Sequence, residues 1–436
     1  MKNKINFNKE LFIPVVNNIK NKKYDRALNL LDQLINQKQD INIINKLKAS
    51  IYLKKKEWSN SLSNYIKIVD GENSYEITNN MGVALYSLGR LSEASVKFER
   101  SLNINNSYIP AYENLILTYR LLGNYELAIK FITQALKLNP NNKKIKNNLI
   151  DIFNYYEPRD VQNSIINANL EINKLNLLKK KKIIQNFELH NLFEKSEKIL
   201  KKNNIKLDCA ETQIFRKNTL NLNCKRHLKV FSIHKIIPKF CFNCYKVQIT
   251  LSSIVDLIKL YFYFNNLFLK KNNIRKCIVE LRKNISGNYK GYIFTSSIIE
   301  SEEIMNLVKK DLIDKEINLD KIEIKHGCTE YYSEYALFKK TDQEVKNKIY
   351  QNEWDNIEKE FDDKNLIKEN DMEKIFNNTL NKFNLSDYLI IKNWFLYAKI
   401  IGDFSYQEVF KLDIDDKHLS LIQKEQISLR ENNLVN

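Results

Sequence analysis

Apolar residues recur at helical spacing through the segment 1–142, and the anchor positions repeat at a nearly fixed interval. Leu91 and Ala94 are matched one interval later by Tyr125 and Ala128, and other apolar and small residues match between the same two stretches. Apolar residues three and four positions apart form one face of a helix. A small residue at a repeated position lets two such helices approach closely. The pattern therefore predicts a series of packed helix pairs.

The same anchors are present earlier in the chain, although they are less regular. Tyr24 and Ala27 begin the series, and Trp58 and Ser61 follow after the same interval. A 34-residue period with a small residue at the helix crossing resembles the tetratricopeptide repeat, a helix–turn–helix unit. Gly82 also matches the small residue that this repeat carries in its first helix. We predict four units, at residues 8–41, 42–74, 75–108 and 109–142.

The resemblance implies a function for these units, because stacked helix pairs form a groove lined by the first helix of each pair. Members of the family bind peptides or proteins there. Some members hold a C-terminal carboxylate with lysine and asparagine, and the matching positions here contain a glutamate and no lysine, which disfavours that ligand class. The alternative is a solvated polar face with no dedicated ligand. The predicted groove residues are Asn79, Asn80, Tyr86, Glu113, Asn114 and Arg120.

Residues 143–215 continue the helical pattern and then become polar and rich in lysine. The stretch 145–182 is apolar at helical spacing, and 183–200 is amphipathic. Repeat arrays need terminal helices that cover the last apolar face. We therefore predict capping helices followed by a basic linker.

The pattern changes in residues 216–330, where short runs rich in β-branched and aromatic residues alternate with longer apolar stretches. Strands are predicted at 247–250, 277–281, 292–295 and 321–325, and helices at 254–267 and 301–313, the second of them capped by Ser301. The order β-α-β-β-α-β matches a ferredoxin-like arrangement, whose sheet has the strand order 4-1-3-2. A small α+β domain is therefore predicted.

Residues 331–436 are acidic and predict helices around 354–361 and 389–401, the second ending at Gly402. The whole chain is thus predicted to be multidomain. An all-α solenoid of tetratricopeptide-like repeats (8–142) is followed by the capping helices and basic linker (143–215). The ferredoxin-like α+β domain (216–330) and an acidic helical region (331–436) complete the chain.

Five of the six cysteines fall within or beside the α+β domain, and four chemistry-bearing residues have the spacing of a zinc site. Two residues separate Cys224 from His227, and the same spacing recurs shortly afterwards between Cys241 and Cys244. Thiolates and neutral imidazole are ligands that Zn²⁺ takes in tetrahedral structural sites. Because the last strand of the sheet ends beside the start of the first, Cys328 is the predicted substitute ligand. The alternatives are buried thiols that only fill a core, and iron–sulfur or redox chemistry.

The charge of the chain raises a nucleic-acid alternative. The net charge is +18, and residues 171–290 alone contain 26 basic and 8 acidic residues. The segment Lys290–Phe294 resembles the start of the RNA-recognition sequence K/R-G-F/Y-G/A-F. Only 10 of the 70 basic residues are arginine, however, and residues 301–436 have a net charge of −8. RNA binding by the basic ferredoxin-like module is therefore the second prediction, after a protein-interaction scaffold.

Several other functions are disfavoured by missing motifs. The chain has no Gly-x-Gly and no Gly-Lys-Ser/Thr sequence, which excludes the usual dinucleotide and P-loop phosphate sites. A third alternative is an enzyme whose Cys/His cluster modifies a protein substrate, but no catalytic residue is predicted. No secretory signal or membrane span is predicted, so the expected location is the cytoplasm. The only expected cofactor is a structural zinc ion.

Overall fold

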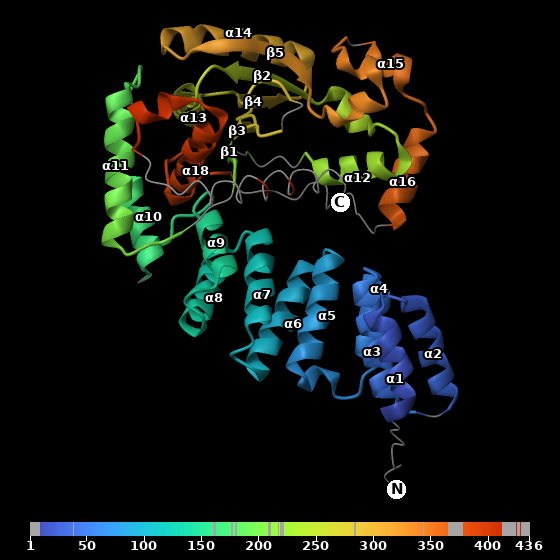
Figure 1. Ribbon diagram of the computed structural model, residues 1–436. Coiled ribbons are helices and arrows are strands. Elements are labelled where there is room, and N and C mark those ends of the chain that lie inside the picture. The colour runs from blue at the N-terminus through green and yellow to red at the C-terminus, as the bar shows by residue number, and fades with distance from the viewer. Residues whose placement is uncertain are drawn as a thin grey trace. The chain divides into compact units, whose positions relative to one another are not determined.

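The computed structural model describes most of the chain and divides it into two compact units (Figure 1). The described residues are 9–411, Lys424 and Ser428, except 38, 160–162, 176–177, 179–180, 208–210, 217, 219–221, 283–284, 343 and 365–377. Unit 1 comprises residues 1–149 and unit 2 comprises residues 150–436. The predicted acidic region 331–436 therefore extends partly outside the described residues.

Unit 1 is a series of helix pairs at the predicted positions. Each helix from α1 to α7 packs on the next one along the chain, as a repeat array requires. The predicted helical repeat region is therefore confirmed. The helices are α1 (Lys9–Lys20), α2 (Tyr24–Asn36), α3 (Ile41–Lys54), α4 (Trp58–Ile66), α5 (Tyr75–Ser87), α6 (Leu91–Ile104), α7 (Ile109–Leu121), α8 (Tyr125–Leu138) and α9 (Lys143–Ile152).

Local chemistry sets where these helices begin and end. Ser74 caps α5 by accepting a hydrogen bond from the Ile77 amide, at 3.4 Å. Gly89 and Gly123 follow α5 and α7 with φ angles of 76° and 71°, a left-handed conformation that suits glycine at a helix end. Glycine is therefore favoured at these two turns for backbone reasons.

The crossing of α5 and α6 is tight because Gly82 lies against a fully buried phenylalanine. A Cβ atom at Gly82 would lie 2.6 Å from Cε1 of Phe98, and Phe98 has no exposed surface. The predicted role of Gly82 at a helix crossing is thus borne out.

A methyl group at this crossing should destabilise unit 1. We expect Gly82→Ala to lower the free energy of unfolding by about 1–3 kcal/mol, the usual cost of overpacking a core. Urea denaturation followed by circular dichroism measures the change. Adding Phe98→Leu should relieve part of the cost, and Ser87→Ala, at an exposed position near the end of the same helix, should have little effect. Equal midpoints for Gly82→Ala and wild type would contradict the close approach.

Unit 2 is built on a five-stranded sheet in which every neighbouring pair of strands is antiparallel. The strands are β1 (Gln213–Arg216), β2 (Tyr245–Leu251), β3 (Arg275–Val279), β4 (Tyr289–Thr295) and β5 (Leu319–His326), in the order β1-β3-β4-β2-β5. The last four are the predicted strands, in the predicted ferredoxin-like order. Strand β1 is an addition at the edge, in a segment predicted to be a linker.

Two helices cover one face of this sheet. Helix α13 (Ile254–Asn266) packs closely on β4, where a Cβ atom at Gly291 would lie 2.4 Å from Cδ2 of Leu260. Helix α14 (Ile298–Asp314) is attached to the same face, because Ser301 hydrogen-bonds Thr295, at 2.6 Å. The predicted cap of α14 is corrected by the structure. Ser297 caps the helix, and Ser301 is buried within its first turn.

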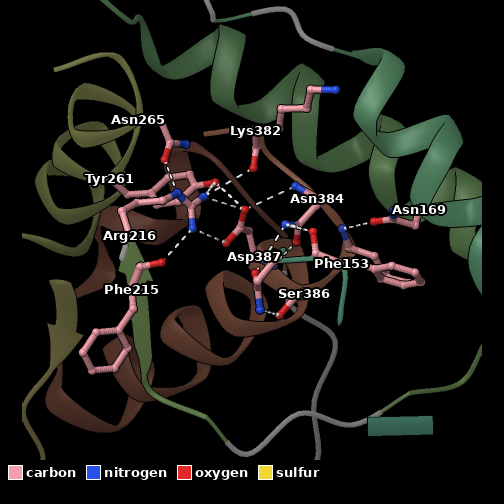
Figure 2. Close-up of polar contacts among 12 residues, drawn as sticks. Phe153, Asn169, Phe215, Arg216, Tyr261, Asn265, Lys382, Asn384, Ser386 and Asp387 are labelled. Atoms are coloured by element: carbon pink, nitrogen blue, oxygen red, sulfur yellow. Dashed lines mark hydrogen bonds and ion pairs between the residues drawn. The ribbon is translucent and has the colours of Figure 1, made fainter. Parts of the chain in front are cut away.

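The late helix α18 (Leu385–Ile401) joins the edge strand β1 through a buried ion pair (Figure 2). A guanidinium nitrogen of Arg216 lies 2.8 Å from a carboxylate oxygen of Asp387, and both side chains are almost completely buried. The hydroxyl of Tyr261 donates to the same carboxylate, at 2.7 Å, and Arg216 also donates to Asn265, at 2.6 Å. The burial that would lower the pKa of Arg216 is outweighed by this carboxylate, so its pKa is raised.

Further short helices enclose a second apolar core beyond one end of the sheet. Its aromatic residues include Phe231, Tyr331, Phe338 and Trp354, all buried. Arg226 ties two of the helices together, because its guanidinium lies 2.7 Å from the Asp362 carboxylate. The remaining elements of unit 2 are α10 (Ser164–Leu175), α11 (Asn186–Lys202), α12 (Cys224–His234), η2 (Lys239–Asn243), η3 (Glu330–Ser333), η4 (Ala336–Lys339), α15 (Val345–Ile349), α16 (Trp354–Lys364) and η5 (Phe404–Glu408).

Candidate protein-binding face and cysteine cluster

Three alternate helices of unit 1 carry asparagine at the same repeat position. Asn80 on α5, Asn114 on α7 and Asn148 on α9 follow one another at one repeat period. Asn80 and Asn114 are half-buried, and Asn148 is buried. Because the units repeat, equal positions fall on the same side of the array. These residues define one polar face of unit 1.

Hydrogen bonds link the polar residues of neighbouring helices on this face. The amide of Asn114 donates to the side-chain oxygen of Asn79, at 3.1 Å, and so connects α7 to α5. The amide of Asn80 donates to the hydroxyl of Tyr65 in α4, at 3.2 Å. Arg120 on α7 donates to the side-chain oxygen of Asn148 on α9. We call Asn79, Asn80, Asn114, Arg120 and Asn148 the polar ladder.

The two other predicted groove residues lie beside this ladder. Glu113 pairs with the ammonium group of Lys144, at 2.6 Å, and accepts a hydrogen bond from Asn142, at 3.1 Å. Tyr86 is half-buried, and burial raises the pKa of its hydroxyl although the nearby Arg120 lowers it. Thus the glutamate that replaces an expected lysine is neutralised by Lys144 at the start of α9. Binding of a ligand by any of the six residues stays a prediction.

The cysteines predicted to bind metal come together from four segments of unit 2. Cys224 begins α12, Cys241 lies in η2, and Cys244 directly precedes β2. Cys328 follows β5, and its side chain hydrogen-bonds that of Cys224. The fifth described cysteine, Cys277, lies in β3 and is fully buried close to the Arg216–Asp387 pair, so it is not part of this group.

His227, three residues after Cys224 in α12, contacts a different set of residues. Its ring stacks on Phe240, with 5.2 Å between the ring centroids. Burial, with a further contribution from Arg226, lowers its pKa to about 4. Together with Lys239 it lines a surface cavity of about 510 Å³ between α12, η2 and α16.

As the side chains are placed, no three histidine, cysteine, aspartate or glutamate residues in the described part of the chain are spaced to hold a metal ion. Burial raises the pKa of Cys244 to about 12, and burial also raises the pKa of Cys241 well above its usual range. Protonated thiols are poor nucleophiles. The zinc site and the enzyme alternative both remain predictions.

The segment that resembles an RNA-binding strand lies in β4. Its aromatic residues Tyr292 and Phe294 alternate with Gly291 and Ile293, and therefore point to the sheet face opposite α13 and α14. The ammonium groups of Lys246 and Lys276 lie 5.3 and 5.0 Å from the centre of the Tyr292 ring. Aromatic and basic side chains thus share this face, and RNA binding stays a prediction.

A membrane-spanning helix is another feature that the structure can test directly. Across the described residues, none of the helices combines the length and the apolar character that crossing a bilayer requires.

Comparison with known proteins identifies one repeat unit directly. The family model of the tetratricopeptide repeat matches residues 109–142, so α7 and α8 form such a repeat. No curated protein matches the chain.

Three solved structures similar to this chain illustrate the likeness. MamA is 16% identical, with 32% of this chain and 82% of that chain covered and a TM-score of 0.31. The first tetratricopeptide repeat domain of Spaghetti (RPAP3), bound to an HSP90 peptide, is 25% identical, with 26% and 91% covered and a TM-score of 0.24. YrrB, described as having an unusual peptide-binding site, is 17% identical, with 31% and 71% covered and a TM-score of 0.30.

Proposed function

We propose that the tetratricopeptide repeats of this chain make it a protein-interaction scaffold, which binds an extended peptide segment of a partner through the polar ladder. The observation that carries the proposal is the recurrence of asparagine at Asn80, Asn114 and Asn148, at intervals of one repeat period on one face. A fold that only needs a solvated surface does not require the same amide at three positions one repeat period apart.

The chemistry of asparagine suits recognition of a peptide main chain. Its side-chain amide has both a donor and an acceptor, as each peptide group does. Main-chain hydrogen bonds give affinity to an extended segment while leaving its side chains free to vary. The hydrogen bonds among Asn79, Asn114, Arg120 and Asn148 hold the amides in fixed positions before the ligand arrives. Fixed positions reduce the conformational entropy that binding would cost.

The ladder also has limited charge selectivity. Arg120 supplies a guanidinium group, while Glu113 is neutralised by Lys144. The face therefore offers one cationic group among neutral amides. We expect peptides with at least one acidic side chain to bind better than basic ones.

Substitution of the ladder should weaken peptide binding without unfolding the array. Peptides selected from a random display library against the full chain provide the probe. Each of Asn80→Ala and Asn114→Ala should cost about 1 kcal/mol, the net value of a typical hydrogen bond, which is a roughly fivefold increase in Kd. Titration calorimetry with one selected peptide measures the change.

The matched control is Asn103→Ala, which removes an exposed asparagine from α6, outside the ladder. It should leave Kd unchanged. The proposal is wrong if no peptide is selected, or if the selected peptides bind the Asn80→Ala/Asn114→Ala variant as tightly as wild type. Circular dichroism of each variant shows that the helices are intact.

A further inference from the structure

The four cysteines Cys224, Cys241, Cys244 and Cys328 occupy one end of the sheet in unit 2. Strand pairing brings two of their segments together, because Tyr245 at the start of β2 lies opposite His326 at the end of β5. The amide of Gly327 donates to the carbonyl oxygen of Cys244, at 2.8 Å. Cys328 is the next residue, so the backbone itself holds Cys328 beside Cys244.

The loop at Gly327 passes directly over the Cys244 sulfur. A Cβ atom at Gly327 would lie 2.5 Å from Sγ of Cys244, so a larger residue there would displace the thiol. On the other side, Cys241 and Cys244 are joined by a turn in which the Cys244 amide donates to the Cys241 carbonyl oxygen, at 3.3 Å. A turn of this kind directs two thiols separated by two residues toward a common point.

The remaining contacts complete the group. The side chains of Cys224 and Cys328 share a hydrogen bond. Cys328 is also close enough to Cys241 and Cys244 for the charge of one thiolate to raise the pKa of the other thiols. Sulfur atoms around a tetrahedral zinc ion lie about 3.8 Å apart, given Zn–S bonds of about 2.3 Å. The backbone already places these cysteines in neighbouring segments, and rotation of their side chains would bring the four sulfur atoms to this spacing.

We propose that Cys224, Cys241, Cys244 and Cys328 bind one Zn²⁺ ion through four thiolates, with His227 outside the site. The ring of His227 stacks on Phe240 and lies beside the cationic Arg226. A nearby guanidinium disfavours a metal cation, whereas an all-thiolate set with no open position suits structural zinc. The apolar core around Tyr331 and Phe338, which contains Cys241 and contacts Cys328, would enclose the ion. The site is independent of the proposed peptide binding.

Binding requires each thiol to lose its proton, and it requires the hydrogen bonds of Cys241, Cys224 and Cys328 to be broken. The Sγ atom of Cys241 is now paired with the hydroxyl of Tyr331, at 3.2 Å, and Cys224 with Cys328. Four thiols lose four protons to solvent as one Zn²⁺ ion binds, and no bond other than S–H is broken. The metal then connects α12, η2, β2 and the segment after β5.

The test uses the full chain purified under reducing conditions, with Zn²⁺ content measured by elemental analysis. We expect about one zinc per chain, as in a single closed site. Cys328→Ser and Cys244→Ser should reduce the zinc content to background. His227→Ala should retain the ion, and so should Cys277→Ser, the matched control for losing a buried thiol.

A second measurement covers the case in which the serine variants fail to fold. X-ray absorption of the zinc-loaded wild-type chain should show four sulfur neighbours at about 2.3 Å and no nitrogen neighbour. A Co²⁺-substituted sample should show thiolate-to-metal charge-transfer bands. Absence of bound metal, binding of iron in place of zinc, a nitrogen ligand that disappears in His227→Ala, or a Cys224–Cys328 disulfide in the purified reduced chain would each overturn the proposal.

Discussion

Replacing Asp387 with asparagine should be among the most damaging single changes in unit 2, with an expected loss of about 3–5 kcal/mol in the free energy of unfolding. The substitution keeps the shape of the side chain but removes its charge. Arg216, which is 4% exposed, would then be a buried cation without its counter-ion. Asp387 also accepts the hydroxyl of Tyr261, so the change weakens a second buried hydrogen bond. Removing one partner of a buried ion pair costs far more free energy than the intact pair contributes to stability.

Tryptophan fluorescence during urea denaturation measures this loss. Two of the three tryptophans, Trp354 and Trp394, lie in unit 2, and Trp58→Phe removes the signal of unit 1. Asp314→Asn, the same chemical change at an exposed position on α14, serves as the control and should not shift the midpoint. Replacing both partners, as Arg216→Met with Asp387→Leu, should recover much of the stability. An Asp387→Asn midpoint equal to that of the control would show that the ion pair has little structural role.

The largest expected effect in unit 1 comes from Phe98→Ala, which should cost about 3–5 kcal/mol, the range for deletion of a buried aromatic ring. Phe98 is completely buried and fills the space left open by Gly82. Because Gly82 has no side chain, α5 cannot compensate by moving a group into the cavity. A repeat array is stabilised by contacts between neighbours, so the loss should be strongest in α5 and α6.

Amide hydrogen exchange read by mass spectrometry locates the effect. Peptides from α5 and α6 should exchange much faster in the variant, while peptides from the sheet of unit 2 should be unchanged. Val96→Ala, on the same helix but 62% exposed, should exchange like wild type. Uniform protection across α5 and α6 in Phe98→Ala would mean that the array does not depend on this contact.

The array could be predicted from the sequence because its determinants are local and repeated. Gly89 and Gly123 end helices through backbone conformation, and Ala94 and Ala128 are buried where two helices cross. Neighbouring units share the same anchor positions. A unit with irregular anchors can therefore be located from its spacing to a regular neighbour. The same register assigns Asn79, Asn80 and Asn114 to α5 and α7, where the structure has them. It could not show the hydrogen bonds between helices, and Asn148 was not among the predicted groove residues.

The strands of unit 2 could be predicted from the sequence where apolar and polar residues alternate over five or more positions. Shorter or less regular elements were harder to predict. Strand β1 has only four residues and lies at an edge, so its alternating pattern is too short to distinguish from a linker. Helix α12 is short and strongly basic, so the spacing of Cys224 and His227 predicts metal ligands without predicting a helix. For α14, two serines one helical turn apart could each serve as the cap. The structure selects Ser297, because the hydroxyl of Ser301 is bonded to Thr295.

The least predictable features depend on residues far apart in the chain. Nothing near Arg216 indicates that its counter-ion is 171 residues away, at Asp387. The cysteine group is an intermediate case. The expected sheet order predicted that Cys328 would lie near Cys244 and left Cys277 outside the predicted metal site, but it could not show that the Cys277 thiol is buried beside Arg216. Only side-chain packing distinguishes a clustered thiol from one that fills a core.

The long sequence separation within the Arg216–Asp387 pair also sets the order of events during protein synthesis. The ribosome makes about 5–20 residues per second, so about 10–30 s pass between synthesis of Arg216 and of Asp387. Each repeat of unit 1 contacts only sequence neighbours, and it can pack as soon as it emerges. In contrast, the guanidinium of Arg216 in the edge strand β1 has no counter-ion until α18 has been synthesised, when nearly the whole chain is complete. A nascent chain arrested before residue 387 should therefore have a folded array and a C-terminal portion that still requires protection from aggregation.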